Sequence, residues 1–100
     1  KALSKKLVII VDKANNKLDS LEILMLCNEM LDKIDLNIKK LEIHDSLIKI
    51  NTSSNLLISD RKNLELNLKR LIESYGNLQR LFKKDIKSID MRYSNGFAIK

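Results

Sequence analysis

The spacing of apolar residues changes along this chain, and that change limits the available folds more than any other feature. In some segments apolar residues recur at every second position, which is the period of a strand with one buried face. In others they recur every three or four positions, which is the period of a helix. The 100 residues include no proline and two glycines, so few positions interrupt either pattern. We therefore expect strands and helices to follow one another along a folded chain.

The first predicted helix covers about residues 20–35. Asp19 and Glu22 have the spacing of a capping box, in which each residue closes a free backbone N–H at the helix start. The apolar residues that follow fall on about a third of the helix circumference, opposite a charged face. The members of this stripe are Ile23, Leu24, Cys27, Met30, Leu31 and Ile34.

A second amphipathic helix is predicted after residue 60. Ser59 or Asp60 is the expected N-cap, and Gly76 is expected to end the helix in a left-handed conformation. A further apolar helical turn follows at 78–82. The stripe that we expect to be buried consists of Leu64, Leu68, Leu71, Ile72 and Tyr75.

The remaining apolar segments have the features of strands. Residues 7–11 form a β-branched run typical of a buried strand, and the polar residues 12–17 are predicted to be a loop. Leu41 and Ile43, and then Ile48 and Ile50, alternate with polar residues on either side of a tight turn. Further strands are predicted at 56–58, 89–93 and 97–99.

This order predicts an α+β domain. Its sheet is mostly antiparallel, and its two main amphipathic helices pack on one face, because both stripes and the inward phases of the strands need one shared core. One hundred residues suffice for one such core and are too few for two. We therefore expect residues 1–100 to form a single domain.

Residues with catalytic chemistry are few. The sequence shows no nucleophile with a neighbouring base, no glycine-rich phosphate loop and no cluster of metal ligands. His44 lies on the polar phase of its strand, so we expect an exposed histidine. Cys27 lies on the apolar stripe of the first helix, so we expect a small core residue. These features predict a protein that is not an enzyme and that has no cofactor or metal.

The net charge is positive, since 19 Lys and Arg residues face 13 Asp and Glu residues, a difference of +6. Basic residues are interleaved with acidic ones from end to end, and the four aromatic residues include no Trp on which bases would stack. We expect this charge to serve as a solvated surface. The alternative is a basic nucleic-acid-binding module, whose binding would depend steeply on salt.

The C-terminal segment is the most distinctive part of the chain. It reads DMRYSNGFAI at 90–99 and ends in a short strand that we expect at a sheet edge. An open edge carries backbone N–H and C=O groups that accept another strand unless they are blunted, and Lys100 is the one charge among the last four residues. Tyr93 shares its phase with Ile89 and Met91, so a core position for Tyr93 is the alternative to a contact position.

This segment resembles the end of the periplasmic β-domain of the FtsQ/DivIB cell-division family. In that family a strand with Asp, Arg and Tyr, a small or polar pair, and Gly precede a final apolar strand. Here the matching residues are IDMRYSNGFAI at 89–99. The order of the other segments also agrees, including the Leu-rich second helix with Leu64, Leu68, Arg70, Leu71 and Tyr75.

The resemblance implies a non-enzymatic scaffold of the division machinery (divisome) on the periplasmic side of the bacterial inner membrane. It also implies that this chain is the C-terminal fragment of a longer single-pass membrane protein, preceded there by a cytoplasmic tail, a membrane helix and a POTRA domain. The implied partners are the FtsB and FtsL pair, with a segment of FtsB adding as a strand to the C-terminal sheet edge. The partner-binding residues implied are Arg92, Tyr93, Asn95, Gly96, Phe97 and Ile99.

Overall fold

The sheet contains six strands whose spatial order follows the chain. The computed structural model describes residues 9–13, 17–82, 86–94 and 96–100. A central antiparallel meander is flanked on each side by a parallel pairing, β1 with β2 and β4 with β5, and β6 pairs antiparallel with β5. The strands are β1 (Ile9–Asp12), β2 (Ile38–Ile43), β3 (Leu47–Thr52), β4 (Leu56–Asp60), β5 (Ser88–Asp90) and β6 (Ala98–Ile99).

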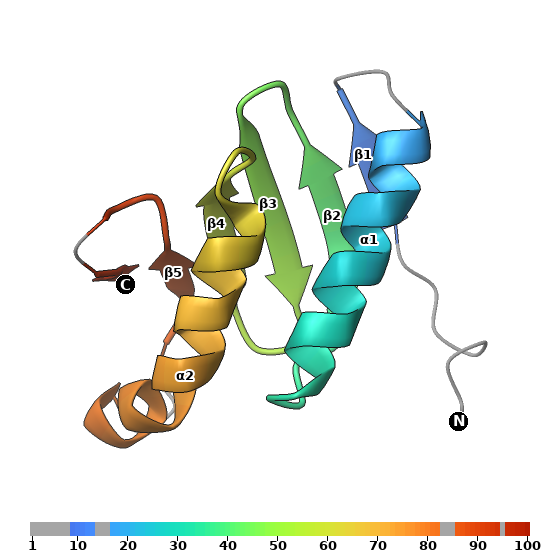
Figure 1. The fold of residues 1–100 in the computed structure, drawn as a ribbon. Coiled ribbons are helices and arrows are strands. Elements are labelled where there is room, and N and C mark those ends of the chain that lie inside the picture. Colours follow the sequence, from blue (N-terminus) through green and yellow to red (C-terminus); the bar gives the residue numbers. More distant parts are fainter. Residues whose placement is uncertain (1–8, 14–16, 83–85, 95) are drawn as a thin grey trace.

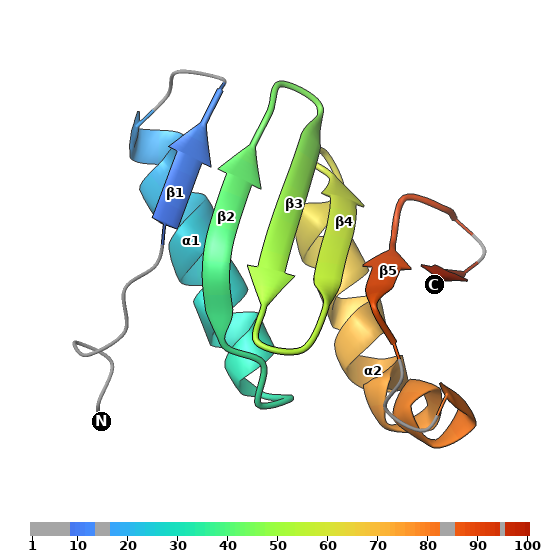
Figure 2. The same ribbon diagram turned by 180° about the vertical axis from the view of Figure 1, so that it is seen from behind.

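The two helices form the crossover connections of the two parallel pairings. Helix α1 (Lys17–Asp32) joins β1 to β2, and α2 (Leu64–Phe82) joins β4 to β5. Both lie on the same face of the sheet and contact each other (Figure 1). Neither helix covers the opposite face, which Figure 2 shows from behind. The predicted α+β fold, with a mostly antiparallel sheet and two helices on one face, is confirmed.

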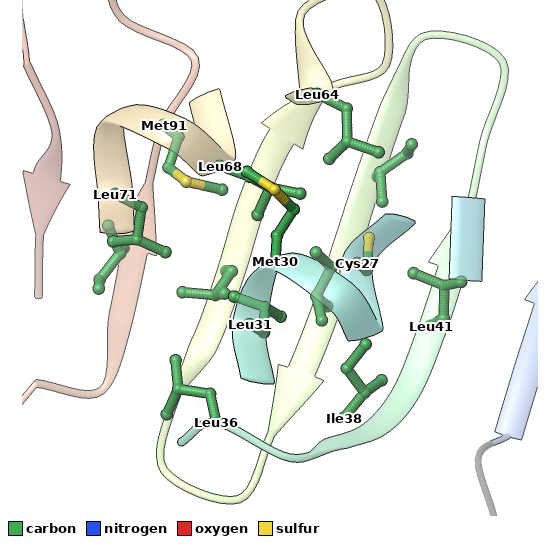
Figure 3. Close-up of a cluster of buried hydrophobic side chains, with 14 of the residues drawn as sticks. Cys27, Met30, Leu31, Leu36, Ile38, Leu41, Leu64, Leu68, Leu71 and Met91 are labelled. Atoms are coloured by element: carbon green, nitrogen blue, oxygen red, sulfur yellow. The ribbon is translucent and has the colours of Figure 1, made fainter. Parts of the chain in front are cut away.

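The core lies between the helices and the covered face of the sheet. Leu41 pairs with Ile50, and Ile50 with Leu57, so the inward residues of neighbouring strands lie side by side. Side chains of α1 and α2 point toward this row (Figure 3). Among the described residues, the fully buried apolar side chains are Cys27, Leu31, Leu41, Ile43, Ile48, Ile50, Leu57, Leu68, Leu71, Ile89 and Met91. Both predicted stripes therefore supply the core.

The ends of α1 differ from the prediction. The helix begins at Lys17, so Asp19 lies in its first turn and the predicted capping box is wrong. It ends at Asp32, and Asp35 has a φ of 58°. Leu36 N–H donates to the Leu31 carbonyl at 3.1 Å, and Asp35 N–H donates to the Asp32 carbonyl at 3.2 Å. These bonds form a Schellman motif with an aspartate in the left-handed position that glycine usually occupies.

The predicted ends of α2 are also wrong. Ser59 and Asp60 belong to β4, and the helix begins only at Leu64. Their side chains still hold its start, because Asn67 Nδ2 donates to Ser59 Oγ at 2.9 Å and to Asp60 Oδ1 at 2.8 Å. Gly76 lies within the helix, which continues to Phe82, because packing on the sheet continues past it at the half-buried Leu78.

The strand limits shift as well. β1 covers Ile9–Asp12, and residues 7 and 8 of the predicted strand lie outside the described residues. Asp12 and Lys17, which we expected in a loop, belong to β1 and α1. β5 covers Ser88–Asp90, so it begins one residue before the predicted strand 89–93 and ends three residues before the end of that strand.

Candidate functional site

The C-terminal strand lies at one edge of the sheet, where the sequence placed it. Lys100 N–H donates to the Ser88 carbonyl at 3.0 Å, and Ser88 N–H donates back to the Lys100 carbonyl at 3.3 Å. In an antiparallel ladder, residue pairs joined by hydrogen bonds alternate with pairs that are not. Ser88 and Lys100 form a hydrogen-bonded pair, so the next pair, Ile89 and Ile99, is not hydrogen-bonded. The backbone N–H and C=O of Ile99 therefore point away from β5, toward the open edge.

Tyr93 lies on the surface beside this edge. Its side chain is 54% exposed, although Ile89 and Met91 are fully buried. The alternation stops after Met91, whose N–H bonds to the Ile58 carbonyl at 2.7 Å, because the chain then leaves the sheet to turn toward β6. The alternative that Tyr93 is a core residue is wrong.

Arg92 is bound within the domain. Its Nε donates to Asp90 Oδ1 at 2.9 Å, and its Nη2 donates to Asp90 Oδ2 at 2.7 Å, which is a bidentate pair. The hydrogen bond from the Arg92 side chain holds the pKa of Asp90 below its ordinary value. The resemblance implies that Arg92 binds a partner, but in the free domain its guanidinium is already paired with Asp90.

Arg70 is the residue of this site that sequence reasoning missed. The sequence indicated only that Arg70 belongs to the Leu-rich second helix, yet its Nη2 donates to the carbonyls of Tyr93 and Gly96, each at 3.1 Å. Its guanidinium also lies over the Phe97 ring, 5.1 Å from the centroid. The one sequence feature that points to a bound Arg70 is Asn67, a polar residue three positions earlier on the same helix. Its Oδ1 accepts a hydrogen bond from Arg70 Nη1 at 3.0 Å.

Of the remaining predicted site residues, Gly96 and Phe97 lie just before β6, and Ile99 lies in β6. Gly96 has a φ of 155°, a backbone conformation that residues other than glycine rarely adopt. Phe97 and Ile99 are half-buried and pack against the core. Asn95 lies outside the described residues. A shallow hollow of about 280 Å³ between α2 and this turn is lined by Arg70, Glu73, Ser74, Ser94, Gly96 and Phe97.

The chemically versatile residues lie away from this edge. Cys27 is fully buried, and burial raises the pKa of its thiol to about 12. His44 is partly buried and its Nε2 lies 3.4 Å from Glu42 Oε1. Within the described residues no group of His, Cys, Asp and Glu gathers as metal ligands would.

Several basic side chains pair with nearby carboxylates. Arg61 Nη2 donates to Asp19 Oδ2 at 2.7 Å, and Arg61 Nη1 donates to the His44 carbonyl at 3.0 Å. Lys40 lies 3.4 Å from Glu42. These pairs fit the interleaving of opposite charges seen in the sequence.

The comparisons add no family assignment. The chain matches no protein-family model and no curated protein sequence. In the part of the chain that the structure describes, neither helix is both long and apolar enough to cross a bilayer. The C-terminal edge and the motif at 89–99 are the features of this domain that bear most directly on its function.

Proposed function

We propose that this protein is a non-enzymatic cell-division scaffold whose C-terminal sheet edge binds a strand of a partner protein. The single observation that supports it most is the open edge of β6 beside an exposed tyrosine. Strand addition needs outward N–H and C=O groups, and the Ile99 position offers both. It also needs a side chain for specificity, and Tyr93 is a residue type that often dominates interfaces.

The partner follows from the family resemblance. In that family the added strand comes from FtsB, which acts with FtsL on the periplasmic side of the inner membrane. The segment 89–99 carries the resemblance, and it includes the residues that form the edge, the turn and the exposed ring. We propose Tyr93, Phe97 and Ile99 as direct contacts. Arg92 and Gly96 give the turn its shape.

Calorimetry with a peptide from the C-terminal region of FtsB tests this proposal. Tyr93→Ala should weaken binding by about thirtyfold, or about 2 kcal/mol, because the variant loses an anchoring ring. Its melting temperature should stay near that of the wild type, because the ring is exposed in the free domain. Met25→Ala is the matched control: this side chain is 70% exposed, and its helix α1 packs beside β1 and β2, away from the β6 edge.

Two results contradict the proposal. One is normal peptide binding by Tyr93→Ala, which would move the site elsewhere. The other is no binding by the wild-type domain together with binding of nucleic acid that falls steeply with salt, which would favour the basic nucleic-acid module instead.

A further inference from the structure

Arg70 connects α2 to the turn that precedes the last strand. Its contacts span 23 residues to Tyr93 and 26 residues to Gly96. The accepting groups are backbone carbonyls on both sides of the turn, and the guanidinium also covers the Phe97 ring. One side chain therefore fixes the turn at its start, at its end and at the first residue after it.

The guanidinium is itself held in place from the core side. Asn67 is 3% exposed and accepts from Arg70 through its oxygen. Its nitrogen donates to Ser59 and Asp60 at the end of β4. A continuous chain of hydrogen bonds therefore connects the end of β4 to the C-terminal turn.

The last strand is short, and its two side chains are only half-buried. β6 comprises two residues, and its pairing with β5 covers two residue pairs. Fixing the backbone of a residue costs about 1–2 kcal/mol in conformational entropy, which so short a ladder offsets poorly. Contacts from outside this ladder therefore add to what keeps β6 in place, and they include the packing of Phe97 and Ile99 against the core and the hydrogen bonds of Arg70.

We propose that Arg70 is a positioning residue that holds β6 in place as a template for the incoming strand. This inference rests on the proposed function. Lysine cannot replace arginine here, because an ammonium lacks the planar fork that donates to Asn67 and to two carbonyls at once. A strand that is ordered in advance spares the partner the entropy of ordering it, so affinity should depend on Arg70 without direct contact.

Hydrogen exchange of single amides tests the positioning role without any partner. In Arg70→Ala and Arg70→Lys, the amides of Ser88 and Lys100, which bond across the β5–β6 pair, should exchange at least tenfold faster. The His44 amide, bonded to Leu47 in the β2–β3 hairpin, should keep its rate. Arg80→Ala, an exposed arginine on the same helix, is the matched control. If Arg70→Ala also speeds exchange of the His44 amide in the hairpin, the exchange rates of Arg70→Lys decide whether Arg70 holds β6.

Calorimetry with the same FtsB peptide gives the second measurement, and both Arg70 variants should bind at least tenfold more weakly. Weaker binding with unchanged exchange would overturn the proposal, because Arg70 would then contact the partner directly. Faster exchange with full affinity would also overturn it. If the wild type binds no peptide, the proposed function fails. Exchange alone then decides whether Arg70 holds the strand: faster exchange supports that role and an unchanged rate overturns it.

Discussion

Asp90 and Arg92 form a pair whose energetics depend on pH. Asp90 has its ordinary pKa near 3.8 when unfolded, and the hydrogen bond from the Arg92 side chain lowers that pKa in the folded domain. At a pH between the folded and the unfolded pKa, this carboxyl group binds fewer protons in the folded state than in the unfolded state. Its contribution to stability is therefore present above about pH 3.8 and lost as the pH falls through the lower folded value.

We expect Asp90→Asn to melt at a lower temperature than the wild type at about pH 7, and we expect this difference to shrink at about pH 2. Arg92→Gln removes the same pair from the other side and should show the same convergence. Melts of the three proteins followed by circular dichroism provide the measurement. A difference that stays constant with pH would mean that the pair does not couple to folding.

Helix α2 contains a glycine, Gly76, at a position where neither the packing nor the backbone conformation requires glycine. A methyl group built at Gly76 meets nothing within 4 Å, and no positive φ forces glycine there. Glycine loses more backbone freedom on folding than alanine does, so it weakens a helix interior. The continuation to Phe82 is instead supported by the packed residues on either side of Gly76.

Gly76→Ala should raise the free energy of unfolding by about 0.5–1 kcal/mol, because alanine costs less conformational entropy in a helix. Thermal melts should show a rise of several degrees. Gly96→Ala is the matched comparison and should lower the melting temperature, because a φ of 155° strains any side chain. A destabilising Gly76→Ala would mean that the helix ends at Gly76.

The whole molecule depends on one core that both helices and the sheet share. Leu68 is fully buried, and in Figure 3 it lies near Met30 of α1 above the sheet. In the described parts of the chain, buried residues of both helices belong to this one core, so loss of packing at this point affects both. We therefore expect the domain to unfold as a single cooperative unit.

Leu68→Ala should cost about 2–5 kcal/mol of unfolding free energy, because the substitution removes buried methyl groups and leaves a cavity. Lys69→Ala should cost little, because that side chain is 62% exposed and its partner Glu65 lies 4.0 Å away on the surface. Urea denaturation of both variants measures the difference. Equal midpoints would show that the assigned buried face of α2 is wrong.

The sequence alone determined the type of most elements and the face that each one buries. Side-chain direction repeats with period two in a strand and 3.6 in a helix, so local spacing is enough to place Ile48 or Leu68 in the core. The motif at 89–99 likewise indicated the edge, and the β6 position agrees with it. The outward Ile99 backbone follows once the pairing is known.

The tertiary structure decided the ends of the helices and the support of the site. Asp35 adopts a left-handed conformation because Leu36 then packs into the core, and Gly76 stays helical because Tyr75 and Leu78 on either side of it pack in or against the core. Arg70 reaches the carbonyls of Tyr93 and Gly96 across more than twenty residues of chain. Local spacing carries no information about such contacts, because they exist only after the sheet has brought α2 beside the C-terminal turn.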